Sequence, residues 1–238
     1  MRYLAMLLCI LPLAAPAQHL LDAYESNPPQ ILAAAWTFAD GAVMRDYTRN
    51  RANGTWSDAV CIDTGVAGGA VRFAGAEHIF DPLCWNRSTY FTITFWYRTS
   101  TLPQYGALFY NGHAGANGYG LYIGGTGPNS GSNIRLLLGG QSTYDSGVDA
   151  DTNGWHFVAL RRSSALGPSY ISIDDEYIAG TVNQIPLTPI TEEFNVGSLN
   201  PQEAAPFTGD IDEIVLWPRF LSEAELKQIY EQQKALLP

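Results

Sequence analysis

Cysteine and histidine are scarce in this sequence, and their scarcity limits the chemistry available to it. The 238 residues include 3 Cys and 4 His, and none of them stand in the CxxC or Cys/His spacings that bind zinc. The sequence also lacks the Walker A, dinucleotide-binding and G-x-S-x-G motifs. Zinc modules, nucleotide-binding enzymes and serine hydrolases of these types are therefore excluded.

Positive charge is also in short supply. The chain has 13 Lys and Arg residues against 23 Asp and Glu residues, which gives a formal net charge of −10. A protein this acidic is a poor partner for nucleic acid or for an anionic lipid surface. The composition is better suited to cations, calcium among them.

Long hydrophobic runs are missing as well. The one candidate, residues 4–13, is too short for a transmembrane helix and is interrupted by Pro12. Arg2 precedes this run, and the Ala15–Ala17 segment after it has the small-x-small form of a cleavage site. Residues 1–17 are therefore predicted to be a signal peptide. The mature protein would be extracellular, or periplasmic in a Gram-negative host, with no membrane span.

The remaining cysteines fit an exported protein. Cys9 would leave with the signal peptide, and Cys61 and Cys84 would remain as a pair. In an oxidising compartment this pair predicts one disulfide. Two buried free thiols are the alternative. Asn53 and Asn86 begin glycosylation sequons, which matter only in a host that glycosylates.

What the sequence has in abundance points to β structure. It contains 23 Gly, 14 Pro and 12% aromatic residues, and short apolar alternations recur between turn signals, as in sandwiches and barrels. Residues 89–98 are the clearest strand, with Phe91, Ile93, Phe95 and Tyr97 on one face. Further strands are predicted at 32–38, 70–73, 107–110, 120–123, 134–138, 155–161, 170–173, 177–179, 194–197 and 211–217.

One helix is predicted near the C-terminus. Ser222 and Glu225 have the spacing of a capping box, S-x-x-E. Leu226, Ile229 and Tyr230 follow as a narrow apolar stripe. A helix this short is not stable alone, so it should dock on the sheets.

Several segments in this order resemble the laminin G-like, concanavalin A-like lectin family, in its pentraxin-like branch. Residues 91–99 (FTITFWYRT) are similar to the family's FTISFWVKT strand, and 153–161 (NGWHFVALR) to its DGQWHHVAVTR strand. Segments 36–41, 70–75, 170–174, 209–214 and 219–225 also resemble family motifs.

The resemblance implies an all-β fold, a two-sheet antiparallel β-sandwich of the jelly-roll type with one short C-terminal helix. The expected organisation is a spacer at 18–30 and one domain at 31–238. The family fold hosts lectins, adhesion modules, enzyme accessories and some hydrolases, so the resemblance indicates the fold more strongly than the function.

The resemblance also implies a structural calcium ion between the loop after the first strand and a strand near the C-terminus. The matching positions are Asp40, Asp46 and Asp212. Calcium takes six to eight oxygen ligands, and three aspartates brought together without a cation would repel one another. Ala39 stands where the family often has an acid. The alternative is that these aspartates are solvated or cap turns.

Carbohydrate binding is the preferred ligand class, because aromatic rings stack on the apolar faces of sugars while polar groups bind the hydroxyls. The candidate ligand-binding residues lie in and around glycine-rich loops: Tyr105, Asn111, Asn117, Tyr119, Tyr122 and Tyr144. Packing or loop anchoring is the alternative role for any one of these rings.

Catalysis has weaker support. Asp210 and Asp212 lie on one face of a strand, which suits glycoside hydrolysis. The related hydrolases place a third acid where this chain has Ile214. Arg161 and Arg162 are predicted to be a solvated strand end, and His156 a surface or half-buried strand residue.

The sequence therefore predicts a secreted, non-catalytic binding module, whose partner is a glycan or a glycosylated extracellular protein. An extracellular protein–protein adhesion or structural module is the second possibility, and a glycoside hydrolase-like enzyme is the third. Clustered solvated aromatics would favour a sugar ligand, and a flat apolar patch would favour a protein.

Overall fold

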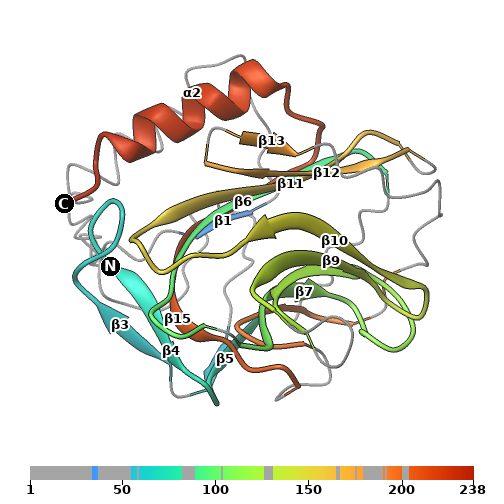
Figure 1. Cartoon of the computed structure of the whole chain (residues 1–238), viewed down its shortest axis with the longest axis horizontal. Helices are drawn as coiled ribbons and strands as arrows, with labels where there is room; N and C mark the ends of the chain where they lie inside the picture. The colour runs from blue at the N-terminus through green and yellow to red at the C-terminus, as the bar shows by residue number, and fades with distance from the viewer. Residues whose placement is uncertain are drawn as a thin grey trace, which may run out of the picture.

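The computed structural model describes residues 34–36, 55–57, 59–81, 89–102, 104–125, 131–164, 167–174, 176–178, 190, 192–199 and 204–238. They form two antiparallel sheets, called sheet A and sheet B below, and one helix (Figure 1). The predicted all-β sandwich with a short C-terminal helix is thus confirmed.

Sheet A has eight strands in the described part of the chain, ordered β13-β12-β11-β6-β15-β4-β3, with β1 paired to β15. Its members are β1 (Ala34–Trp36), β3 (Val60–Ile62), β4 (Ala70–Ala74), β6 (Phe91–Arg98), β11 (His156–Arg162), β12 (Ser169–Ile173), β13 (Glu176–Ile178) and β15 (Thr208–Trp217). The C-terminal strand β15 lies between β6 and β4, so the last strand of the chain is central to the sheet.

Sheet B has seven strands in the described residues, ordered β10-β9-β8-β7-β14-β5-β2. They are β2 (Thr55–Ser57), β5 (His78–Asp81), β7 (Gly106–Asn111), β8 (Tyr119–Ile123), β9 (Asn133–Leu138), β10 (Ser142–Asp149) and β14 (Phe194–Val196). The chain passes from edge strand β10 of sheet B to β11 of sheet A through residues 150–155.

The main core lies between the two sheets. The predicted inward face of β6, from Phe91 to Tyr97, belongs to this core. Phe91 stacks on Tyr119 of sheet B with ring centroids 4.5 Å apart, and Phe95 meets Phe109 edge-on at 5.6 Å. Such aromatic pairs bury large apolar areas and tie the sheets together.

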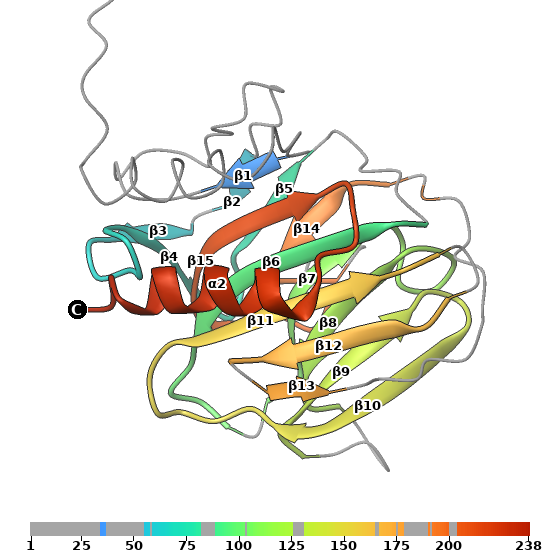
Figure 2. The same ribbon diagram turned by 90° about the horizontal axis from the view of Figure 1, so that it is seen from above.

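A second cluster covers the outside of sheet A. Helix α2 (Glu223–Lys234) lies in front of β6, β11 and β15 in Figure 2. The Tyr230 ring stacks on Trp96 with centroids 5.8 Å apart, and Gln233 accepts a hydrogen bond from the Trp96 indole at 2.6 Å. The predicted capping box is present, since the Ser222 side chain accepts from the Glu225 amide and the Glu225 side chain accepts from the Ser222 amide.

The helix explains why the second face of β6 is buried. Thr92, Thr94 and Trp96 are each at most 1% exposed. The sequence pattern predicts only that this face combines polar and apolar residues, and it does not predict that the face is buried. Thr92 Oγ1 donates to the Arg219 carbonyl at 3.0 Å and accepts from the Leu221 amide at 2.9 Å. The segment leading into the helix therefore satisfies polar side chains that would otherwise be buried unpaired.

The prediction of a solvated strand end at Arg161 and Arg162 is wrong. Both residues are buried, at 3% and 0% exposure. Arg161 donates to the Leu221 carbonyl at 3.0 Å, and its guanidinium lies 4.9 Å from the Phe220 ring centroid. Arg162 donates to the Ser169 hydroxyl at 3.1 Å.

Several predictions fall outside the described residues. The signal peptide (1–17) and the spacer (18–30) are among them, as are Asn53, Cys84 and Asn86. The Cys61–Cys84 disulfide therefore stays a prediction. In the described part of the chain, no helix has the length and hydropathy needed to cross a membrane.

Candidate functional site

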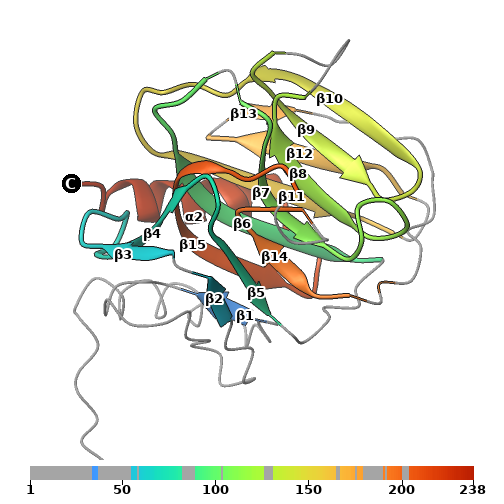
Figure 3. The same cartoon turned by 90° about the horizontal axis from the view of Figure 1, so that it is seen from below.

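The outer face of sheet B is turned away from the core and from the helix. Figure 3 shows sheet B in front, with α2 behind it. On this face the register pairs Tyr122 of β8 with Arg135 of β9, and Arg135 with Asp145 of β10. Because paired residues point to the same side of a sheet, these side chains form one row, while the alternating Leu121 and Leu136 enter the core.

Tyr105 extends this row, just before β7. Its side chain is 41% exposed, and its ring meets the Tyr122 ring edge-on, with centroids 5.5 Å apart and an interplanar angle of 87°. Tyr122 is only 4% exposed, and its hydroxyl shares a hydrogen bond with the Thr143 side chain. We call the group formed by Tyr105, Tyr122, Thr143 and Asp145 the tyrosine platform.

A polar network fixes one side of the platform. Arg135, with 4% of its side chain exposed, donates to Asp145 Oδ2 from Nε at 3.1 Å and from Nη2 at 2.7 Å. Asp145 Oδ1 accepts from Asn133 Nδ2 at 2.7 Å and from the Gly147 amide at 2.8 Å. With four donors on one carboxylate, Asp145 is held in a single orientation although its side chain is 43% exposed.

The ionisation of the platform follows from these contacts. Desolvation would raise the pKa of Asp145, but the hydrogen bonds from Asn133, Gly147 and Arg135 outweigh it and lower the pKa below its usual value. Burial raises the pKa of Tyr122. At neutral pH the platform therefore presents a fixed carboxylate beside a neutral phenol.

The neighbouring part of the outer face is filled by the protein itself. Tyr110 is fully buried, and its hydroxyl donates to the Asn117 carbonyl at 2.9 Å. A Cβ on Gly120 would lie 2.6 Å from the Tyr110 ring and 2.2 Å from the Phe109 carbonyl oxygen, so only glycine fits there. Leu199 and Ala205, from the connection between β14 and β15, belong to the same apolar cluster.

The structure divides the six predicted ligand-binding residues into two groups. Tyr105 and Tyr122 lie together on the platform. Tyr119 is a core residue, 1% exposed, whose hydroxyl accepts from Asn111 Nδ2 at 3.1 Å, and Asn111 is itself fully buried. For this pair, the packing role is the one that the structure supports.

Asn117 and Tyr144 also have structural contacts. Asn117 is 8% exposed, and its Oδ1 accepts from the His113 amide at 3.1 Å, which shapes the turn between β7 and β8. Tyr144 lies on β10 next to Asp145 and is therefore on the opposite face, packed against the core. Neither side chain belongs to the tyrosine platform.

Sequence reasoning missed Arg135 and Asp145. The signal that could have identified Asp145 is the alternation of Tyr144 and Val148 with Asp145 and Asp149. In the structure these positions are alternately half-buried and exposed. Few of these residues are apolar, so the pattern is easily taken for a loop. Pairing with β9 makes the segment a strand.

The acids of β15, considered above for hydrolysis, are engaged in other contacts. Asp210 is 4% exposed and pairs with both Arg72 and Arg98, while Asp212 is 0% exposed. A β-bulge follows Asp212, where Glu213 adopts a left-handed φ of 53° and is 1% exposed. The described carboxylates of this strand therefore offer no solvent-facing pair for glycoside hydrolysis.

Asp212 holds a glycine-rich loop. Its Oδ2 accepts from the Val66 amide at 2.8 Å, and its Oδ1 accepts from the Glu213 amide at 2.8 Å. A Cβ on Gly65 would lie 2.6 Å from Asp212 Oδ2 and 2.3 Å from the Gly69 carbonyl oxygen. The loop between β3 and β4 thus closes over this carboxylate only because Gly65 lacks a side chain.

The described residues fit the predicted calcium ion only in part. Glu213 Oε2 is buried with no hydrogen-bond partner, beside the buried Asp212 carboxylate. Burial, together with the Asp212 charge, raises the pKa of Glu213 well above its usual range. The described ranges contain no group of three or more His, Cys, Asp or Glu side chains that could hold a metal ion. Asp40 and Asp46 lie outside the described residues, so the site stays a prediction.

His156 is half-buried, as predicted, and lies between two carboxylates. Its Nδ1 is 2.9 Å from Asp174 Oδ2, and its Nε2 is 2.6 Å from Asp151 Oδ1. Nε2 makes no hydrogen bond, so its approach to Asp151 is an ionic contact of the protonated imidazole. The hydrogen bond with Asp174, followed by the charges of both carboxylates, raises the pKa of His156 despite its burial.

Comparison with known families decides the identity of the fold. The profile of the concanavalin A-like lectin/glucanases superfamily matches residues 68–227, which include strands β4 to β15 and the start of the helix. The chain belongs to the concanavalin A-like lectin/glucanase superfamily. Among curated proteins, no sequence matches it.

Solved structures agree with this superfamily membership. Domain 4 of AbnA, a GH43 extracellular arabinanase from Geobacillus stearothermophilus, solved with arabinotriose, superposes with a TM-score of 0.69 at 19% identity, covering 84% of this chain and 98% of that domain. Trypanosoma rangeli sialidase in complex with sialic acid gives 0.65 at 18%, over 87% of this chain and 33% of the sialidase. The binding domain of Paraclostridial Mosquitocidal Protein 1 gives 0.64 at 14%, over 84% and 51%.

These similarities have limits. At such low identities they establish the shared lectin/glucanase-like fold and no ligand. This chain spans one third of the sialidase and about half of the mosquitocidal binding domain. Sialidase activity and mosquitocidal activity are therefore stated only of those longer proteins.

Proposed function

We propose that this protein is a carbohydrate-binding module whose binding face is the tyrosine platform on sheet B. The observation that carries the proposal is the solvent-exposed Tyr105 ring, braced edge-on by Tyr122. A braced ring loses little conformational freedom when a ligand stacks on it. Its apolar face suits the C–H face of a pyranose or furanose ring.

Polar groups around the ring suit sugar hydroxyls. Thr143 is exposed and its hydroxyl can both donate and accept. Asn133 uses an N–H on Asp145, which leaves its carbonyl oxygen for a sugar hydroxyl. Asp145 and Arg135 fix these positions in advance, and preorganised polar groups orient a ligand in sites of this kind.

Three observations favour a sugar over the alternatives. Among the described residues, the exposed large apolar side chains are Val60, Tyr90 and Tyr105, so no broad apolar patch of the kind used for protein adhesion is present there. The buried or paired acids of β15 argue against hydrolysis on that strand. The arabinotriose-bound arabinanase domain of the same fold supports the choice of a glycan.

A structural calcium ion and export are parts of the same proposal. Asp212, with Asp40 and Asp46, would hold the ion. Its positive charge would neutralise the carboxylates of these aspartates next to the buried Glu213. The signal-like residues 1–17 would direct the chain out of the cytoplasm, where its partner would be a glycan or a glycosylated extracellular protein.

The test is a glycan array followed by calorimetry on the wild-type protein and on Tyr105→Ala. Removing the ring should weaken binding of the best neutral glycan about tenfold, in line with the energy of a stacked aromatic contact. Tyr90→Ala is the matched control, because Tyr90 is 56% exposed just before β6 of sheet A, outside the platform. Equal affinities for wild type and Tyr105→Ala, or no bound glycan at all, would contradict the proposal.

A further inference from the structure

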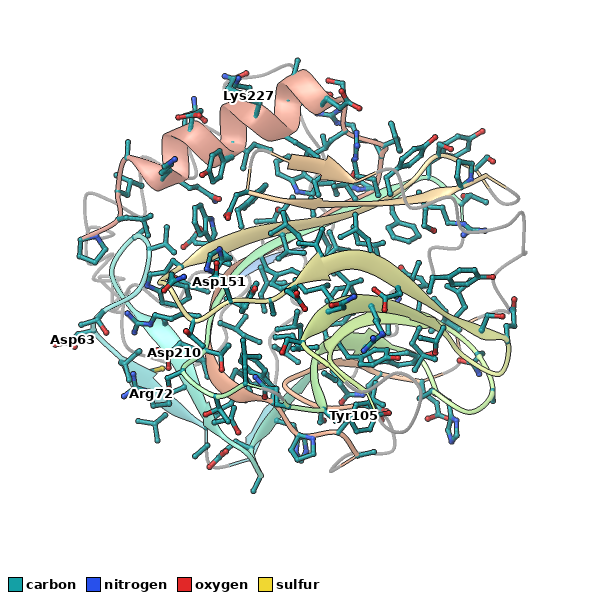
Figure 4. All side chains as sticks on the ribbon, viewed as in Figure 1. Asp63, Arg72, Tyr105, Asp151, Asp210 and Lys227 are labelled. Carbon is teal, nitrogen blue, oxygen red and sulfur yellow. The ribbon has the colours of Figure 1, made fainter. Side chains whose placement is uncertain are left out.

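The outer face of sheet A carries a second cluster of polar side chains, beyond the end of helix α2. The register pairs Val60 with Arg72, Arg72 with Asp210, and Asp210 with Arg98, across strands β3, β4, β15 and β6. Trp155 continues the row, since the Arg98 guanidinium lies 4.7 Å from its ring centroid. In Figure 4, Arg72 and Asp210 lie together on the left, apart from Tyr105 and from Lys227 on the helix.

This row remains open to solvent although its centre is buried. The side chains of Arg72 and Arg98 are 53% and 30% exposed, and Val60 is 58% exposed. The Asp210 side chain between them is only 6% exposed. The two guanidinium groups therefore form the accessible surface, and the carboxylate lies beneath them.

The two arginines hold Asp210 with four hydrogen bonds. Arg72 donates to it from Nε at 2.8 Å and from Nη2 at 3.1 Å. Arg98 donates to it from Nη2 at 2.7 Å and from Nε at 3.1 Å. Arg72 bridges the two carboxylate oxygens, whereas both Arg98 donors go to Oδ2, so Oδ2 accepts three hydrogen bonds and Oδ1 accepts one.

The two arginines, by contrast, keep unused donors. A guanidinium carries five N–H groups. Arg72 uses two of them on Asp210, and Arg98 uses two on Asp210 besides a long 3.5 Å contact to Thr64. Trp155 Nε1 has no hydrogen-bond partner in the described part of the chain, but it is buried and is not part of the accessible donor surface. The accessible surface therefore offers mainly the N–H donors of the two arginines, because the Asp210 side chain is only 6% exposed.

Charge restricts the ligand further. Two guanidiniums against one carboxylate leave a local excess of one positive charge, in a chain whose formal net charge is −10. The screening length at physiological salt is about 8 Å, so a single anionic group at the arginines experiences mainly the local charge. A polyanion would extend over the acidic remainder of the surface and be repelled.

We propose that Arg72, Arg98 and Trp155 form a second sugar site, which binds the carboxylate of a single acidic sugar such as a uronic acid. The carboxylate would accept from the outward N–H groups of the two guanidiniums, the planar geometry that arginine binds bidentately. The Trp155 ring, 4.7 Å from the Arg98 guanidinium, would hold that guanidinium in position. This site is independent of the tyrosine platform and lies on the opposite sheet.

The experiment compares two ligands that differ in one group. Calorimetry with the full chain should show methyl glucuronide binding at least tenfold tighter than methyl glucoside, with the preference falling as salt is raised. Arg72→Gln should abolish the preference. Arg72→Lys, which keeps the charge and loses the planar fork, should retain only part of it.

Controls separate the charge from the site and from the platform. Lys227→Gln removes the same charge from an exposed position on α2 and should leave the glucuronide preference intact. Tyr105→Ala should also leave it intact, whether or not the platform binds a neutral glycan. The proposal is overturned if methyl glucuronide and methyl glucoside bind with equal affinity, or if the preference for glucuronide survives in folded Arg72→Gln. It is also overturned if an acidic peptide competes for the site with a higher affinity than that of methyl glucuronide.

Discussion

The carboxylate of Asp212 accepts a 2.8 Å hydrogen bond from the backbone amide of Val66, 146 residues earlier in the chain. The bond joins the central strand β15 to the loop between β3 and β4, and both residues are fully buried. It therefore closes one end of sheet A.

Replacing Asp212 by alanine tests this closure. The change leaves the buried amides of Val66 and Glu213 without their acceptor, and an unsatisfied buried donor costs about 1–3 kcal/mol. The free energy of unfolding from urea titration should fall by about that much. Asp63→Ala is the control, because Asp63 is exposed on the same connection; an equal loss in both variants would refute the role given to Asp212.

Calcium removal gives a second, independent prediction for the same residue. If Asp212 holds an ion with Asp40 and Asp46, EDTA should lower the melting temperature of the wild-type protein and added calcium should restore it, since a ligand that binds only the folded state stabilises it. Asp212→Ala should show no such response. Identical melting curves in EDTA and in calcium would remove the ion from the proposal.

The contact of His156 with two carboxylates predicts a pH dependence of stability. A neutral imidazole carries one N–H, so only the protonated ring can interact favourably with both Asp151 and Asp174. The pKa of His156 is raised in the folded state, so its contribution is fully present below the unfolded pKa of about 6.5 and is lost as the pH rises through the folded pKa.

The measurement is the urea midpoint of the wild type and of His156→Gln at several pH values from about 5.5 to 8.5, spanning the titration range of histidine. The advantage of the wild type should shrink toward high pH. Tyr97, whose ring lies 5.5 Å from that of His156, stays neutral in this range because burial raises its pKa. His113→Gln, in a turn of sheet B, is the control; parallel curves for wild type and His156→Gln would disprove the assignment.

The capping box of α2 predicts a modest loss of stability on Ser222→Ala. The change removes the acceptor of the Glu225 amide and should cost about 1 kcal/mol. Hydrogen bonding to Arg219 lowers the pKa of Glu225 to about 2, so this cap keeps its charge until strongly acid pH. Thermal unfolding should show the loss in Ser222→Ala and none in Ser100→Ala, which alters an exposed serine.

Tyr110→Phe tests the polar contact under the closed part of sheet B. The change deletes the hydroxyl that donates to the Asn117 carbonyl and keeps the ring packed against Gly120. Stability should fall by about 1 kcal/mol, the net value of a buried hydrogen bond. Tyr90→Phe, at a 56% exposed position, should be neutral. A neutral Tyr110→Phe would show that the turn is held by its other bonds.

The amino-acid sequence by itself determined the elements whose side chains carry their own periodicity. Strand β6 and helix α2 are examples, because their alternation, apolar stripe and capping box are local properties. It also placed Tyr105 and Tyr122 among the candidate residues, since both border glycine-rich loops.

Only the tertiary structure decided which residues share a face. Asp145 and Arg135 are neighbours because β10 pairs with β9. Tyr119 and Tyr144 pack against the core, and the segment before the helix covers Arg161. Arg72, Arg98 and Asp210 come from three strands far apart in the chain. The physical reason is that burial and charge pairing depend on which strand lies alongside, and register is set by long-range packing that no local pattern contains.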